Sequence, residues 1–320
     1  MQYSTYIPCM NTKLLLITAI LSGSVVSVPA VELDIRTGVT SRGGDWTYRI
    51  GRTFTENGQS ESLPFPISEL EWPMASGGLG LDLTADAGAL VFDASVSVYG
   101  GEDGTLKDSD WEDLDDPGLR TTYSDSDTEL MGVEGDVAAA VRWLGGGMRE
   151  DGIGLAFGAG FLVQHWEWEG SDTRQSEVGS PLGFFFPGKT IEYEGDLEMP
   201  YLQLRGHINL ASLRLTGRVG YSPWVTATDT DDHLLRGIKS EADTDGDGFF
   251  AEAGVDIPMS EAWGFFANAN LLWLETEGVS RNRVYEAGPD EELAAGDTWE
   301  IDQEIESLQV GFTAGVRFSL

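Results

Sequence analysis

Apolar residues recur at every second position over long stretches of this chain, and this period of two limits the fold more than any other feature. The pattern is clearest in residues 213–221, 249–257, 263–273 and 308–320. In each segment one set of alternate side chains is apolar and the other is polar or small. A strand with lipid on one face and a polar lumen on the other needs this arrangement over about ten residues. The sequence therefore predicts an all-β fold.

The lengths of the connections distinguish between two all-β folds. Short turns are expected near residues 84–88, 145–152, 211–212 and 258–262, and long polar loops near residues 53–62, 107–127, 170–190, 228–240 and 279–298. A soluble β-sandwich also has alternating strands, but short turns at one end and long loops at the other are typical of outer-membrane barrels. Five long loops and four short turns predict a ten-stranded antiparallel transmembrane β-barrel.

Tryptophans near the expected strand ends fit the same interpretation. We expect them to form aromatic belts at the two membrane interfaces. The residues concerned are Trp72, Trp143, Trp166, Trp168, Trp224, Trp263 and Trp273.

The N-terminal segment has the form of a secretory leader. Lys13 precedes the apolar run Leu14–Ile20, and small residues follow as far as Ala30. The run is too short to span a bilayer as a helix. We therefore predict a signal peptide over residues 1–30, with Met10 as an alternative start, and one barrel domain over residues 31–320. The single cysteine, Cys9, precedes this domain.

The charge balance limits the choice of partner. The chain has 19 Lys and Arg against 54 Asp and Glu, a formal net charge of −35. Such a surface repels nucleic acid and attracts cationic peptides and proteins. With 41% hydrophobic residues, the chain is too apolar to be a disordered acidic chain.

Two acidic segments carry residues suited to activating water. Asp108 and Asp110 could share a proton, and Asp229, Asp231 and His233 follow one another at alternate positions. A carboxylate that orients an imidazole allows it to remove a proton from water, which is worth about 10²–10⁴ in rate. Pairs like these also arise by chance in Asp-rich loops, where a solvated surface is the simpler explanation.

At these residues the sequence resembles the omptin family of outer-membrane proteases. The resemblance is strongest in residues 108–118 (DSDWEDLDDPG), 198–204 (EMPYLQL) and 221–233 (YSPWVTATDTDDH). It implies a barrel that extends above the outer membrane and an aspartic-type endopeptidase site facing the cell exterior. The catalytic pairs would be Asp108 with Asp110 and Asp231 with His233, and a water would attack the peptide carbonyl. No cofactor, catalytic metal or covalent acyl-enzyme is implied, and a monomer is expected.

The resemblance also implies cleavage next to or between basic residues. Asp229 and Asp45 match the acids expected to bind the basic side chain, the latter if one residue is deleted nearby. Thr122 stands where the family often has an acid that contacts the residue after the cleaved bond, so the preference for that residue is left open.

Family members need lipopolysaccharide bound through basic residues. Residues 161–169 contain no Arg or Lys, and Asp196 stands at another expected basic position. The sequence therefore leaves lipopolysaccharide dependence open, with outer-membrane lipid as an expected partner.

Two further expectations concern the site as a whole. If the lipid-facing alternation that ends at Val98 continues unbroken, Asp108 and Asp110 face lipid. If the alternation of residues 213–221 continues unbroken, Asp229, Asp231 and His233 also face lipid. We therefore predict register shifts near Gly100–Gly101 and Ser222–Pro223 that return these side chains to the lumen.

A non-catalytic barrel, acting as an adhesin or structural surface protein, is the alternative function. The four intact catalytic positions favour the protease.

Overall fold

The computed structural model describes residues 31–111, 113, 116, 118–146, 152–180, 182–210, 212–286 and 294–320. The predicted signal peptide, residues 1–30, lies outside these residues. Twelve β-strands make up the described structure: β1 (Glu32–Glu56), β2 (Gln59–Ser62), β3 (Ser68–Pro73), β4 (Ser76–Asp86), β5 (Leu90–Asp110), β6 (Thr122–Leu144), β7 (Gly152–Glu177), β8 (Gly183–Leu210), β9 (Leu213–His233), β10 (Ile238–Pro258), β11 (Trp263–Val284) and β12 (Thr298–Ser319). No helix in the described part of the chain is long and apolar enough to cross a membrane.

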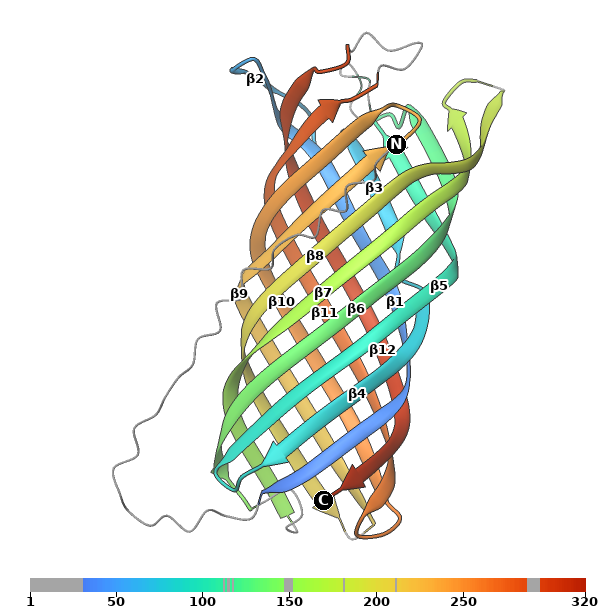
Figure 1. Ribbon diagram of the computed structural model, residues 1–320. Coiled ribbons are helices and arrows are strands. Elements are labelled where there is room, and N and C mark those ends of the chain that lie inside the picture. The colour runs from blue at the N-terminus through green and yellow to red at the C-terminus, as the bar shows by residue number, and fades with distance from the viewer. Residues whose placement is uncertain are drawn as a thin grey trace, which may run out of the picture.

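The strands pair antiparallel with their neighbours and close into a barrel (Figure 1). Closure comes from β12, which pairs with β1 from Asp34↔Ser319 to Thr55↔Glu300. Both β3 and β4 lie between β1 and β5, so they are two segments of one interrupted strand. The short β2 extends the tip of β1. Counting β3 and β4 together, ten strands surround the lumen, as the alternation of turns and loops predicts.

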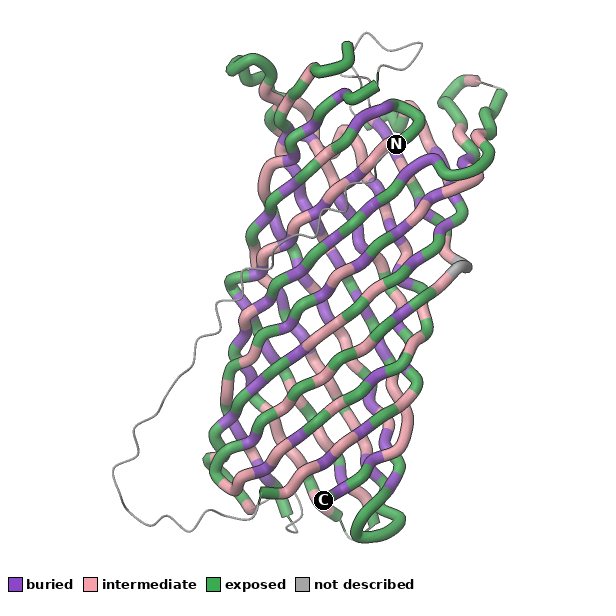
Figure 2. The backbone as a smooth tube through the Cα atoms, viewed as in Figure 1, coloured by how far each residue is buried: buried purple, intermediate pink, exposed green. Residues whose placement is uncertain are grey.

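The outer wall changes character along the barrel axis. On β10 the outward side chains pass from Asp243 and Asp245 to Phe249 and Ile257, all of them exposed. On β12 the outward positions become apolar from Leu308 onward. Exposed and buried positions alternate along the strands, as Figure 2 shows. The half that holds the C-terminus thus presents an apolar band suited to lipid, and the half that holds β2 and β3 projects beyond it with a charged wall.

The barrel strands are longer than the sequence pattern indicates. The short turns between Asp86 and Leu90 and between Pro258 and Trp263 are where they were predicted. The strands on either side of the other two, near residues 145–152 and 211–212, end and begin as predicted, although residues 147–151 and 211 lie outside the described residues. Much of each predicted long loop is strand, because main-chain pairing continues beyond the apolar band. In particular, β9 reaches His233 and β10 starts at Ile238.

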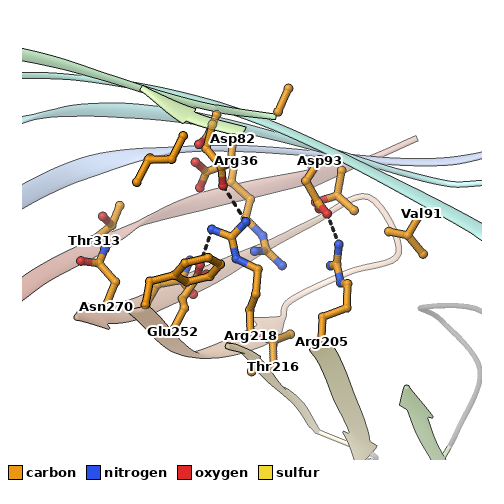
Figure 3. A pocket seen from close by; sticks show the side chains of 18 of the residues that line it. Arg36, Asp82, Val91, Asp93, Arg205, Thr216, Arg218, Glu252, Asn270 and Thr313 are labelled. Atoms are coloured by element: carbon orange, nitrogen blue, oxygen red, sulfur yellow. Dashed lines mark hydrogen bonds and ion pairs between the residues drawn. The ribbon is translucent and has the colours of Figure 1, made fainter. Parts of the chain in front are cut away.

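Ion pairs and one polar cavity occupy the lumen within the apolar band. Arg214 contacts Asp34 at 2.9 Å and Asp256 at 2.8 Å, and all three are buried. A cavity of about 170 Å³ lies among further pairs, including Arg218–Glu252 at 3.2 Å and Arg205–Asp93 (Figure 3). Charges buried in a lumen need such partners.

An aromatic layer lies between this cavity and the projecting half. Its members are Trp46, Trp72, Trp166, Trp168 and Tyr193, all less than about 4% exposed. The ring centroids of Trp72 and Tyr193 are 5.1 Å apart, and those of Trp166 and Trp168 are 6.2 Å apart. The predicted interfacial belts are therefore wrong for Trp72, Trp166 and Trp168, which point inward, whereas Trp143, Trp224 and Trp263 are exposed.

Candidate active site

Two register shifts turn the candidate carboxylates into the lumen. On β5, the three steps from Gly101 to Gly104 face two steps on β6. On β9, the three steps from Ser222 to Val225 face two steps on β10. One extra residue reverses the face of every later side chain. Both predicted register shifts are confirmed.

The reversal is visible in burial along both strands. Val96 and Val98 are exposed on the outer wall, whereas Leu106 and Asp110, at the same parity beyond the shift, are buried. On β9, Tyr221 is exposed, and Asp229 and Asp231 are buried. The sequence thus places acidic residues on the polar side of the barrel in its projecting half.

Asp231 and His233 form a hydrogen-bonded pair. The Oδ2 atom of Asp231 lies 2.9 Å from Nε2 of His233, whose side chain is 22% exposed. The Tyr48 hydroxyl of β1 donates a hydrogen bond to the same Oδ2. Asp231 is thereby fixed from two sides, and the imidazole stands at the end of its strand with access to solvent.

The pKa of His233 reflects this pairing. Burial of the ring lowers its pKa, but the charge of Asp231 and the hydrogen bond to it more than offset that effect, so the net pKa is raised. The imidazole therefore holds a proton more tightly than an isolated histidine does, and the carboxylate stabilises its cationic form.

Asp108 and Asp110 enter the lumen from β5. Burial, and then the like charge of Asp110, raise the pKa of Asp108 to about 7, while His233 and Arg236 act in the opposite direction. The Ser124 hydroxyl donates to Oδ2 of Asp108 at 3.4 Å. Within the described residues, Oδ1 of Asp108 and Oδ1 of Asp231 are buried without a hydrogen-bond partner. These atoms are acceptors suited to a water molecule.

Asp229 lies deeper than the pair formed by Asp231 and His233. Its Oδ2 accepts hydrogen bonds from the Tyr193 hydroxyl at 2.9 Å and from the Gln303 amide. Burial raises its pKa to about 7, Tyr193 lowers it, and Asp231 raises it further. The Tyr193 hydroxyl also accepts a hydrogen bond from Nε1 of Trp46 at 2.7 Å. The aromatic layer thus fixes the carboxyl group from below.

The predicted partnership of Asp45 with Asp229 is not found. Asp45 pairs with Leu308, whose side chain is on the outer wall, and paired residues of antiparallel strands share a face. Burial and the nearby Glu71 and Glu306 raise the pKa of Asp45. Trp46 and Tyr48 occupy the alternate, inward positions and place Asp45 outside the lumen.

Sequence reasoning missed Tyr48, Tyr193 and Gln303. Each contacts a candidate carboxylate, and each lies on a strand far from it in sequence. A local signal existed for Tyr48: it lies two residues after Trp46, so the two large aromatic side chains share one face of the strand. No local signal links Gln303 to Asp229, because closure of the barrel brings them together.

One group of side chains in the described structure has the geometry to hold a metal ion. His165, Glu194 and Asp196 lie on the outer wall, with Nδ1 of His165 at 2.8 Å from Oδ1 of Asp196. Nε2 of the same ring lies 3.1 Å from Glu167. The group shares no residue with the lumenal site.

Fold and site together define an outer-membrane barrel with an Asp–His pair and an Asp–Asp pair at its projecting end. The model of the omptin family matches residues 65–303. The chain belongs to the omptin family and resides in the bacterial outer membrane.

Known proteins give the extent of this similarity. The chain is 28% identical to Protease 7 of Escherichia coli O157:H7 over 179 residues, which are 52% of this chain and 55% of that protein. It is 24% identical to the outer membrane protease OmpP of Escherichia coli K12 over 182 residues, 53% of this chain and 56% of that protein. These matches span about half the length of each relative. The crystal structure of the outer membrane protease OmpT of Escherichia coli superposes with a TM-score of 0.67 at 18% identity, covering 88% of this chain and 96% of that one.

Proposed function

We propose that the protein is a cell-surface endopeptidase of aspartic type that hydrolyses peptide bonds with an activated water. The observation that carries the proposal is the hydrogen bond between Asp231 and His233 in a lumen that also holds Asp108 and Asp110. The names of the relatives, a protease in each case, support it.

The proton transfers follow from the pKa shifts. Neutral His233 removes a proton from a water held by the carboxyl groups, and the oxygen attacks the peptide carbonyl carbon. The resulting oxyanion is stabilised by the proton of Asp108, whose raised pKa keeps it partly protonated near neutral pH. The imidazolium, stabilised by Asp231, then gives its proton to the departing amine as the carbon–nitrogen bond breaks. Atoms and protons balance without a covalent enzyme intermediate.

The proposed substrates are cationic peptides and proteins cut next to a basic residue. A net charge of −35 attracts them from solution. Asp229 is the acid nearest Asp231 in sequence on the inward face of β9, and it is our candidate for contact with the basic side chain. Asp45 is set aside for this role because it lies on the outer wall.

Refolded protein in detergent micelles would be offered quenched peptides in which Arg is followed either by Arg or by an uncharged residue, with and without lipopolysaccharide. We expect cleavage by the native sequence and at least a 100-fold loss in His233→Ala. Stimulation by lipopolysaccharide would establish the lipid as an activating partner. A folded barrel that cuts no peptide under any lipid condition would instead support the non-catalytic surface protein.

A further inference from the structure

A cavity of about 300 Å³ opens beside the candidate catalytic residues. Asp108, Asp110 and His233 line one side of it, and the rest of the wall comes from β6, β7 and β8, with Leu106 of β5 and with Leu235 and Arg236 between β9 and β10. Because the cavity adjoins the reacting groups, a side chain next to the cleaved bond can enter it. The inference below rests on the proposed function and concerns which side chain that is.

The floor of the cavity is built from hydroxyl groups and aliphatic side chains. Ser126, Thr173 and Thr190 supply the hydroxyls, and Leu106 and Ile191 pack beside them, all of them buried. The Thr173 hydroxyl lies 2.7 Å from that of Ser126 and 2.6 Å from that of Thr190. This is an uncharged surface.

The direction of these hydrogen bonds is fixed. The Thr190 hydroxyl donates its one proton to the carbonyl oxygen of Gly170 at 3.1 Å. Thr173 must therefore donate to Thr190, and Ser126 must donate to Thr173. All three protons are used within the wall, and the floor offers only acceptor lone pairs to a ligand.

Among the described residues, the floor of the cavity carries no acidic residue to hold a basic side chain. Apart from the two catalytic aspartates, no described lining residue is acidic, and Arg236 lines the same wall. Arg236 lies close enough to Asp108 and His233 to lower the pKa of each. An ammonium or guanidinium on the floor would exchange its hydration for hydroxyl oxygens and aliphatic side chains and would be repelled by Arg236, which is costly.

We propose that this cavity is the subsite for one of the two residues flanking the cleaved bond and that it selects an uncharged side chain. Aliphatic residues fit Leu106 and Ile191, and residues with a neutral hydrogen-bond donor, such as Ser, Thr or Asn, fit the acceptor floor. The protein would then cut between a basic residue and an uncharged one faster than between two basic residues.

A balanced mixture of synthetic peptides, digested by the refolded full chain in micelles with lipopolysaccharide, would test this. We expect uncharged residues to be favoured over Lys and Arg about tenfold in relative kcat/KM at one position flanking the bond, as a difference of about 1.4 kcal/mol gives. Cleavage fastest between two basic residues would overturn the subsite and leave the protease intact. No cleavage of any peptide by folded protein would overturn both.

One substitution with a matched control places the selectivity in this cavity. Gln175 lines it, and Gln175→Glu adds a carboxylate with almost no change of shape. We expect the preference for Lys and Arg at that position to rise about tenfold, the effect of one charge-assisted hydrogen bond. Ser176→Glu adds the same charge to the neighbouring, exposed residue and should leave the profile unchanged. Equal profiles for both variants and the native sequence would overturn the assignment.

Discussion

The Asp231 carboxylate is the residue on which the proposed chemistry most depends, because it both orients His233 and stabilises its cation. Asp231→Asn should lower kcat about 10²–10⁴-fold, with a much smaller effect on KM, since the interaction strengthens as the imidazole gains its proton. The adjacent Asp232, on the other face of β9, accepts a hydrogen bond from the Tyr285 hydroxyl at 2.8 Å. Asp232→Asn is therefore the matched control and should keep kcat within about twofold. Equal losses in both variants would argue against the pair.

The raised pKa values of His233 and Asp108 predict the pH profile of kcat/KM. Activity should rise as neutral His233 forms, above the ordinary histidine pKa, and should fall as Asp108 loses its proton near pH 7. Asp110→Asn removes the like charge that helps to raise the pKa of Asp108, so the descending limb should move to lower pH. Asp127→Asn, on an exposed outer side chain, should leave the limb in place. A shift to higher pH would show that Asp110 acts otherwise.

Asp229 makes a separate prediction about stability. Its pKa is raised to about 7 from an ordinary value of 3.8, so the folded barrel binds a proton there that the unfolded chain has lost. The free energy of unfolding should fall as pH rises through this window. Asp229→Asn removes the buried charge and should raise resistance to guanidinium more at pH 8 than at pH 4. Unfolding in micelles at both pH values measures the difference, and an equal effect at both would contradict the assigned protonation.

At the scale of elements, the strand parity of β9 decides which face carries the site. Deleting Trp224 leaves two steps between Ser222 and Val225, so the strand loses its irregularity while Val225 still pairs with Gly246 and Asp229 and Asp231 still face the lumen. Inserting one alanine between Val225 and Thr226 keeps the irregularity and moves every later side chain to the opposite face, so Asp229 and Asp231 should turn outward. From the deletion we expect a folded barrel that still cleaves peptides, and from the insertion a folded barrel with no measurable cleavage. Activity in the insertion variant would show that strand parity is not what orients the site.

The strands also show how far sequence reasoning reaches. The alternation of long loops and short turns predicts ten strands, and the period of two predicts the contradiction in parity that only a register shift resolves, because both patterns are local. The extension of β9 to His233 was missed, since the pattern of a lipid-facing strand stops where the lipid stops. The outward direction of Asp45 was missed because it depends on two neighbouring side chains pointing inward: Trp46 belongs to the aromatic layer, and Tyr48 stacks on Tyr193 of that layer. Closure of the barrel assembles the layer from β1, β3, β7 and β8. The contact of Gln303 with Asp229 depends on the same closure.

For the whole molecule, the charge distribution should govern how fast substrates arrive. The formal net charge is −35, and the outer wall of the projecting half carries exposed acids such as Asp243 and Asp245. Attraction between exposed charges is screened beyond about 8 Å at physiological ionic strength. The kcat/KM for a peptide with several Lys and Arg residues should therefore fall about tenfold or more between 10 and 500 mM salt, mainly through the association step.

A peptide with the same residues flanking the cleaved bond but acidic ends provides the control, because the field of the barrel repels it. Its kcat/KM should rise with salt over the same range, while kcat at saturating peptide stays nearly constant for both. The opposite slopes would assign the acidic surplus to capture of cationic substrates. Parallel slopes for the two peptides would mean that salt acts on the barrel or on its lipid, and that the surface charge serves solubility and not recognition.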